Sequence, residues 1–260
     1  MKPYHKILSK ITVIIIFCLS VFGVFKNMQE FLQKNIYVWD EREERKIPIY
    51  CVDTKEKVLS LTFDVAWGNE DMNDILQILK NEKVKVTFFF SGDWINRYPK
   101  DVKKVFKEGH DIGNHGDNHK YMTKLSKEEQ QKEIQGAHDK VKGLLGISMD
   151  LFRPPYGDYN SEVIKNAEEM GYYSIQWSVD SLDWMEPGVD EVINKVCNHK
   201  ALENGAIILM HTGTKCTKEA LQPMIQDLKK KGYKFVPVSQ LIYRKGYRID
   251  PTGKQKKYSY

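Results

Sequence analysis

The sequence contains few cysteines, and their spacing excludes two common kinds of site. None of the four cysteines forms a C-x-x-C pair, so neither a zinc knuckle nor a dithiol redox centre is indicated. Cys18 lies in an apolar N-terminal run, which leaves three cysteines for the rest of the chain and no even number for a disulfide framework. Free thiols are therefore expected, and an exported protein of this kind would not depend on disulfides.

The chain also lacks internal repeats, low-complexity segments and a large excess of charge. Its 260 residues are 41% hydrophobic and 29% charged, which excludes disordered, collagen-like and multi-span membrane proteins. The net charge of +5 comes entirely from residues 244–260, which carry six Lys and Arg and one Asp. Because a nucleic-acid-binding protein carries its positive charge on its folded body, nucleic acid is excluded as a partner.

One long apolar run is present, over residues 11–25, with lysines before it and Lys26 after it. Its 15 residues lie between a signal-peptide core and a membrane span, and counting back to Ile7 while Lys10 snorkels gives 19. The cations on its amino side put the N-terminus in the cytoplasm and the rest of the chain outside. We therefore expect residues 1–26 to be a single-pass anchor in the cell membrane. The alternative is a secreted protein, released by signal cleavage.

Residues 27–56 are polar and mixed in charge, and they are expected to form a stalk or irregular lead-in. Over residues 57–243, short apolar runs alternate seven times with amphipathic stretches of helical period. The expected strands are 58–63, 84–90, 110–114, 151–153, 172–178, 206–211 and 233–238. Such alternation predicts one α/β domain of parallel strands with helices outside, as a doubly wound sheet or a closed barrel. Residues 244–260 are expected to be a basic tail.

Polar and aromatic side chains collect just past the ends of these strands. They include acids, histidines, aromatic residues and one arginine: Asp64, Trp67, His115, His119, Arg153, Tyr156, Asp183, Trp184 and His211. In sheets of this type, ligands bind at the carboxyl ends of the strands. We therefore expect the set to meet at one rim. It has the parts that amide hydrolysis requires, namely a polarising centre, a base for water and an acid for the departing amine.

His115 and His119 are four residues apart, so both imidazoles can reach one divalent ion from a single loop. A histidine pair alone is more often structural or solvent-facing, and the other polar residues strengthen the metal interpretation. Asp64 is expected to be the base, with Arg153 keeping it ionised and oriented, although a buried structural ion pair would have the same sequence signature.

His211 ends an apolar strand and is expected to be the general acid, with Asp183 hydrogen-bonded to its far nitrogen and raising its pKa. A satisfied core histidine is the alternative. Trp67, Trp184 and Tyr156 are expected to supply apolar walls and a stacking face for a sugar ring, although aromatic residues near a barrel mouth often serve packing alone.

Five motifs in this order, TFD, H-x-x-x-H, RPPYG, D-x-x-DW and L-x-H, resemble the polysaccharide deacetylase family with the NodB homology domain, carbohydrate esterase family 4. The resemblance implies a distorted (β/α) barrel of about seven parallel strands. It also implies a metal-dependent hydrolase that removes acetyl groups from N-acetylated sugars of peptidoglycan, chitin or xylan, so the expected partner is a cell-wall glycan. A monomer is expected.

The resemblance assigns the metal-binding histidines to His115 and His119, the catalytic base to Asp64 and the arginine that holds the base to Arg153. The expected metal is zinc, with cobalt or manganese as alternatives. The family's first motif carries a second Asp, a metal ligand, where this chain has Val65.

By the same resemblance, the backbone N–H of Tyr156 helps to form the oxyanion hole, and Asp183 tunes the catalytic histidine, His211. The variant first motif FDVAWG, together with the apolar leader, is similar to sporulation deacetylases of the PdaB type, which carry a comparable hydrophobic substitution. The expected function is therefore removal of N-acetyl groups from peptidoglycan in sporulation.

Val65 leaves the usual ligand set short by one, and three substitutes are open: an extra water, direct ligation by Asp64, or a contribution from Asp117. Val65 also supports an alternative function, a membrane-tethered glycan-binding protein with weak or no turnover. Against that alternative stand four residues that binding alone does not need together: Asp64, Arg153, Asp183 and His211.

Overall fold

The computed structural model describes residues 23–29 and 45–258, which fall into two units that divide between Arg45 and Lys46. The N-terminal unit contains a helix over residues 23–29.

No helix within the described ranges has the length and apolarity that crossing a membrane requires. This finding corrects the expectation of a single-pass protein of the cell membrane anchored by residues 1–26. Most of that predicted anchor, residues 1–22, lies outside the described residues. The secreted alternative stays a prediction.

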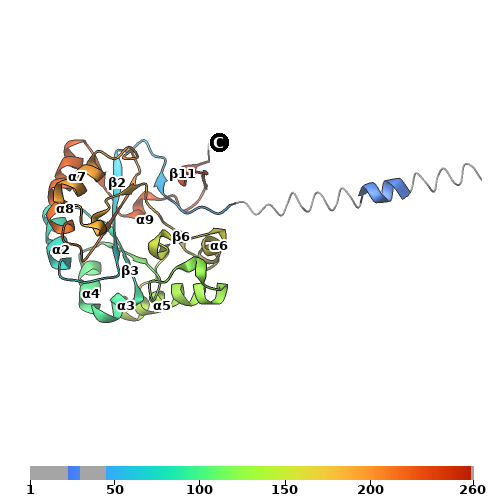
Figure 1. Ribbon diagram of the computed structural model, residues 1–260, viewed down its shortest axis with the longest axis horizontal. Helices are drawn as coiled ribbons and strands as arrows, with labels where there is room; N and C mark the ends of the chain where they lie inside the picture. Colours follow the sequence, from blue (N-terminus) through green and yellow to red (C-terminus); the bar gives the residue numbers. More distant parts are fainter. Residues whose placement is uncertain (1–22, 30–44, 259–260) are drawn as a thin grey trace, which may run out of the picture. The chain divides into compact units, whose positions relative to one another are not determined.

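The larger unit is built on one parallel sheet (Figure 1). Its strands are β2 (Val58–Val65), β3 (Thr87–Phe90), β4 (Asp111–Asn114), β5 (Leu151–Phe152), β6 (Tyr173–Ser174), β7 (Val179–Asp180), β8 (Ile207–His211) and β9 (Lys234–Phe235). Seven of them follow the order β6-β5-β4-β3-β2-β8-β7, and β9 pairs with the start of β2. The predicted α/β class is therefore confirmed, as an open half-barrel, because the short edge strands β6 and β7 do not pair with each other.

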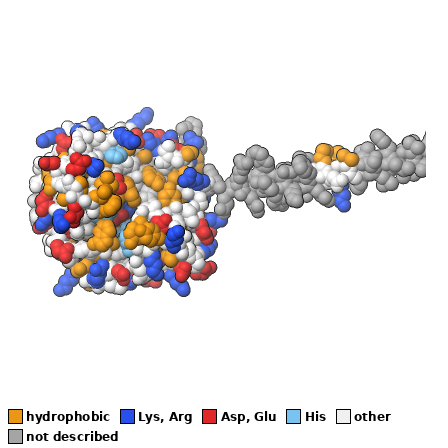
Figure 2. Space-filling view, viewed as in Figure 1, with side chains coloured by type: hydrophobic (Ala, Val, Ile, Leu, Met, Phe, Trp, Pro, Cys, Tyr) orange, Lys and Arg blue, Asp and Glu red, His pale blue; other side chains and the backbone are white. Residues whose placement is uncertain are grey.

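Helices cover the outside of this sheet, apart from one short helix over residues 238–241 that packs against the inner face. They are α2 (Met72–Asn81), α3 (Gly92–Arg97), α4 (Pro99–Lys107), α5 (Lys127–Leu145), α6 (Ser161–Glu169), α7 (Val189–Cys197), α8 (Thr217–Lys230) and α9 (Val238–Leu241), with short 3-10 turns η1 (Met122–Lys124), η2 (Pro155–Gly157) and η3 (Asp183–Met185). Neighbouring helices contact one another in the orders α7-α8-α2 and α4-α3-α5-α6. Figure 2 shows charges of both signs spread over the face in view, with hydrophobic side chains and histidine near its middle.

The central strand β2 explains how the sheet positions polar groups. All eight of its residues are buried, as is usual for a parallel strand covered on both faces. Side chains alternate between the faces, so Leu61, Phe63 and Val65 pack into the large core cluster under the helices. On the inner face, Thr62 and Asp64 follow one another toward the carboxyl end. The strand therefore carries one polar stripe that ends at the rim.

A second, three-stranded sheet joins the two ends of the larger unit. Its order is β1 (Cys51–Val52), β11 (Lys254–Lys257) and β10 (Tyr247–Ile249), with β1 and β11 parallel. The expected basic tail over residues 244–260 is thus corrected, because this segment contains two paired strands. Three of its cations also form ion pairs, such as Lys254 with Glu203 at 2.7 Å.

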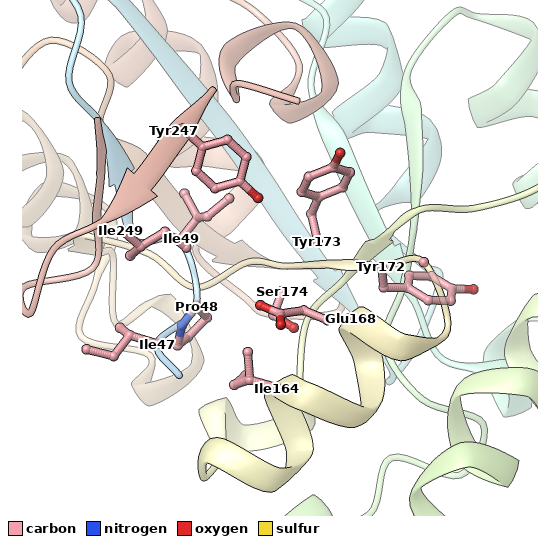
Figure 3. A pocket seen from close by; sticks show the side chains of 11 residues that line it. Ile47, Pro48, Ile49, Ile164, Glu168, Tyr172, Tyr173, Ser174, Tyr247 and Ile249 are labelled. Atoms are coloured by element: carbon pink, nitrogen blue, oxygen red, sulfur yellow. The ribbon is translucent and has the colours of Figure 1, made fainter. Parts of the chain in front are cut away.

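The segment expected to be a stalk or irregular lead-in, residues 27–56, packs against the folded body in its C-terminal part. Ile49 is buried, and its N–H donates to the Ser174 carbonyl at 2.8 Å while its carbonyl accepts from the Gln176 N–H at 2.7 Å. The lead-in thereby covers the free edge of β6. Residues 47–49, α6 and β10 border a pocket of about 230 Å³ (Figure 3), which contains none of the predicted site residues.

Candidate active site

A pocket of about 520 Å³ opens at the carboxyl ends of the parallel strands. This volume is typical of small-molecule sites. Its lining consists of acids, histidines, aromatic and small residues: Asp64, Ala66, Trp67, His115, His119, Tyr156, Gly157, Trp177, Asp180, Trp184, Leu209 and His211. Seven of the nine predicted site residues line it. The other two, Arg153 and Asp183, lie behind it, fully buried and in contact with lining residues.

Asp64 is held from behind by Arg153. The guanidinium Nη1 donates to Asp64 Oδ1 at 2.7 Å and to the Thr62 hydroxyl at 2.9 Å. Burial would raise the pKa of Asp64, but the charge of Arg153, followed by His115 and His211, outweighs burial and lowers that pKa. Asp64 is therefore ionised at neutral pH, with Oδ2 free of the arginine.

His211 is held in a similar way by Asp183. His211 Nδ1 lies 2.7 Å from Asp183 Oδ1, and Oδ2 accepts from the His211 backbone N–H at 2.8 Å and from the Thr217 hydroxyl at 2.5 Å. Burial would lower the pKa of His211, but the hydrogen bond and charge of Asp183 outweigh burial and raise it. Because Nδ1–H donates to the carboxylate, Nε2 is the nitrogen that remains for a ligand.

Asp64 and His211 are direct neighbours in the sheet. They end β2 and β8, and the register of these parallel strands pairs the two residues with each other. Each therefore stands beside the other at the rim, with its own buried partner behind it. We call Asp64–Arg153 and His211–Asp183 the two proton-transfer pairs.

His115 and His119 face each other with their Nε2 atoms 3.2 Å apart, and we call them the imidazole pair. His115 Nδ1 is 2.8 Å from the Arg153 carbonyl oxygen, which can only accept, so Nδ1 carries the proton and Nε2 keeps its lone pair. Burial lowers the pKa of His115. Burial also lowers the pKa of His119, to about 3. Both rings are thus neutral at pH 7, the form that binds metals.

The imidazole pair fits a divalent ion as two of its ligands, but the described residues contain no group of three or more His, Cys, Asp or Glu that could hold one. Val65 is buried in the apolar core cluster. The Asp117 carboxylate forms an ion pair with Lys140. This carboxylate lies so close to Gly136 that a Cβ there would collide with it, so Asp117 is turned away from the histidines. Of the three substitute ligands left open, a contribution from Asp117 is thus excluded, whereas Asp64 Oδ2 lies 3.4 Å from His115 Nε2.

Three residues at the pocket adopt a left-handed backbone that is uncommon outside glycine. Their φ values are 53° for His119, 60° for Tyr156 and 52° for Leu182, which precedes Asp183. Such conformations cost on the order of 1–3 kcal/mol each and persist only where the surroundings impose them. The loops that carry the site are therefore held in specific shapes.

Trp67 lies over the pocket, with its ring centroid 5.3 Å from that of His211 and 6.2 Å from that of His119. Sequence analysis missed Trp177 and Asp180, whose side chains are joined by a hydrogen bond of 3.2 Å from Trp177 Nε1. A single strand was expected over 172–178, but β6 ends at Ser174, which frees Trp177 to face the pocket. The only sequence signal for Asp180 was its place in the D-x-x-DW motif.

Residues 52–175 match the family described as Polysaccharide deacetylase. The chain is 34% identical over 195 residues to the uncharacterized protein YlxY of Bacillus subtilis, covering 75% of this chain and 60% of YlxY, less than two thirds of its length. It is 38% identical over 196 residues to the peptidoglycan-N-acetylglucosamine deacetylase of Bacillus cereus, covering 74% of this chain and 91% of that protein. It is 33% identical over 210 residues to the peptidoglycan-N-acetylmuramic acid deacetylase PdaA of Bacillus subtilis, covering 79% of each.

Among solved structures, the chain resembles a CE4 family pseudoenzyme from Bacillus anthracis. The TM-score is 0.72 and the identity 34%, covering 82% of this chain and 73% of that chain. A mutant of that pseudoenzyme, matched with the same TM-score, is described as having restored enzymatic activity. Thus proteins with and without activity share this scaffold.

Proposed function

This chain belongs to the polysaccharide deacetylase family, and we propose that it removes acetyl groups from N-acetylated amino sugars of peptidoglycan. Its relatives are named peptidoglycan deacetylases, so the predicted enzyme class, hydrolases of amide bonds, is confirmed for the family. One observation carries the proposal for this chain. Both proton-transfer pairs are complete, and their reactive members are adjacent on β2 and β8 in one pocket.

Asp64 supplies the base. Its lowered pKa keeps the carboxylate ionised, and Arg153 occupies Oδ1, so Oδ2 is the atom that takes a proton from the attacking water. A general base of this kind contributes roughly 10²–10⁴ in rate.

His211 supplies the acid. Its raised pKa favours the imidazolium, whose charge Asp183 stabilises, and its Nε2–H donates to the departing amine. The backbone N–H of Tyr156 is proposed to donate to the oxyanion, as the family resemblance implies. A single donor of this kind contributes roughly 3–4 kcal/mol to the transition state.

A divalent ion, expected to be zinc, would be held by His115 and His119. When bound, such an ion polarises a carbonyl group and lowers the pKa of water. Because Val65 cannot bind a metal, a further ligand must be water or Asp64. We favour water, since a carboxylate bound to the ion would be a weaker base.

The alternative is a glycan-binding protein with weak or no turnover. Buried Val65 and the likeness to the Bacillus anthracis pseudoenzyme favour it. A role in sporulation and closeness to the PdaB type rest on the variant first motif, and both stay predictions.

Acetate release from N-acetylated peptidoglycan fragments tests the proposal. We expect the parent chain to release acetate and Asp64→Asn to be silent, with the exposed Asp74→Asn as matched control. If the parent and Asp64→Asn are equally silent while Val65→Asp gains activity, the binding alternative replaces the proposal. Separate assays on fragments acetylated only at glucosamine or only at muramic acid identify the target sugar.

A further inference from the structure

An aromatic stack extends outward from the pocket, and its outer ring, Tyr121, has no part in the proposed reaction. The rings of Tyr121 and Tyr156 stack with centroids 4.1 Å apart and planes 11° from parallel. The ring of Tyr156 also contacts His119, at a centroid distance of 4.4 Å. Tyr156 thus contacts two rings, and Tyr121 covers the face of Tyr156 on which it stacks. The free aromatic face in this stack belongs to Tyr121, which the sequence analysis did not single out.

The stack is not part of the hydrophobic core. Tyr121 and Tyr156 are each 53% exposed, and neither belongs to the core clusters or to the partly buried residues packed against them. Exposed aromatic rings that lie together beside a pocket present an apolar surface to water. A packing role alone therefore does not account for Tyr121, because it covers only another half-exposed ring.

The two loops that carry the stack are tied together. Thr123 lies two residues after Tyr121, and its N–H donates to Asp158 Oδ2 at 2.8 Å while its hydroxyl donates to Asp158 Oδ1 at 2.9 Å. Asp158 itself lies two residues after Tyr156. Met122, between Tyr121 and Thr123, is fully buried. The stack is thus preorganised, which lowers the entropic cost of binding a ligand against it.

We propose that the free face of Tyr121 binds the sugar unit next to the one whose acetyl group occupies the pocket. The inference rests on the proposed function and adds that the site recognises a linear chain of amino sugars rather than a single sugar. Two observations identify this occupant. The stack is continuous with the pocket through Tyr156 and His119, which both line it. In addition, the C–H face of a pyranose is an apolar surface of the kind that packs against a flat ring.

Calorimetric binding of N-acetylchitotetraose and of N-acetylglucosamine to the full chain tests this proposal, with a chelator present so that turnover plays no part. We expect Tyr121→Ala to weaken tetramer binding by about two- to tenfold and to leave monosaccharide binding unchanged. Tyr121→Phe should bind the tetramer like the parent, whereas Tyr121→Leu, which keeps apolar bulk without a flat ring, should not. The matched control is Tyr258→Ala, because Tyr258 is 54% exposed and lies in the C-terminal segment.

The outcomes separate the inference from the proposed function. If the parent binds neither sugar, the proposed substrate class is wrong and the inference is overturned with it. If the parent binds the tetramer but Tyr121→Ala equals Tyr258→Ala, the inference alone is overturned. The inference is also overturned if Tyr121→Ala weakens the binding of both sugars equally, because Tyr121 would then contact the sugar that occupies the pocket.

Discussion

The two sides of the pocket differ in what the chain supplies to their polar groups. In the proton-transfer pairs, each reactive side chain has a buried partner of opposite charge at 2.7 Å. In the imidazole pair, two neutral rings face each other at 3.2 Å, and the position beside Asp64 that could complete a ligand set is an apolar valine. The difference teaches that the chain supplies both members of each acid–base pair, whereas on the imidazole side the described residues supply only two metal-binding side chains.

The largest effect is expected from breaking a proton-transfer pair. Arg153→Met leaves the Asp64 carboxylate buried without its countercharge, and we expect it to lower the free energy of unfolding by about 3–5 kcal/mol. Urea denaturation measures this. Arg244→Met is the matched control, since its ion pair with Asp150 is exposed and contributes about 0–1 kcal/mol. Equal losses in the two variants would mean that Asp64 does not need Arg153.

Val65→Asp changes the imidazole side. A carboxylate among core side chains should destabilise the metal-free chain by about 1–3 kcal/mol. Zinc should then raise the melting temperature of this variant more than that of the parent, because ligand binding stabilises the folded state. Scanning calorimetry with chelator and with zinc measures both effects, and Val65→Asn is the control without a charge. If zinc shifts the variant and the parent equally, position 65 does not reach the imidazole pair.

Asp183→Asn should change the pH dependence more than the fold. The raised pKa of His211 means that its stabilising contribution is complete below about pH 6.5 and is lost as the pH rises through the folded-state pKa. Removing the carboxylate charge lowers that pKa, so the alkaline limb of acetate release should move to lower pH. An NMR titration of the His211 ring measures the shift without requiring activity. The exposed Asp190→Asn should leave the titration unchanged, and an unchanged titration in Asp183→Asn would contradict the pairing.

The smallest effect is expected at Thr217, whose hydroxyl donates to Asp183 Oδ2. Thr217→Val removes the hydrogen bonds of this hydroxyl to the buried Asp183 carboxylate and to the Thr214 hydroxyl. It should lower the free energy of unfolding by about 1–3 kcal/mol, at the lower end because Oδ2 keeps the His211 N–H. Thr217→Ser keeps the hydroxyl and should retain most of that stability. Chemical denaturation distinguishes the two. If Thr217→Ser loses as much free energy of unfolding as Thr217→Val, the effect comes from packing of the methyl group and not from the hydroxyl.

Much of the fold and site could be predicted because the signals were local. All seven expected strands are present, since each is a short apolar run ending in a turn or a polar residue. The residues at those ends meet because parallel strands bring their carboxyl ends to one edge. Trp177 could not be assigned, because residues 172–178 alternate aromatic or apolar with polar side chains over their second half, as one continuous strand would, and give no sign that β6 ends at Ser174.

Other features depend on contacts between distant segments. The sequence KQKK of β11 has no apolar alternation, and its pairing with β1 depends on residues far away along the chain. Asp117 was a reasonable candidate metal ligand from its residue type and its place between the two histidines in the sequence. Only its fit against Gly92 and Gly136 and its pairing with Lys140 show that it serves packing.

The parallel pairing of Cys51 with Lys254 has a consequence for biosynthesis. Its two strands are about 200 residues apart, so during translation this pairing cannot form until β11 has left the ribosome, whereas the contact of Cys51 with Ala206 can form earlier. The edge of β1 that β11 covers therefore stays unprotected until nearly the whole body is made. Nascent chains halted before residue 254 should consequently be more exposed to proteases and chaperones at this edge than finished ones.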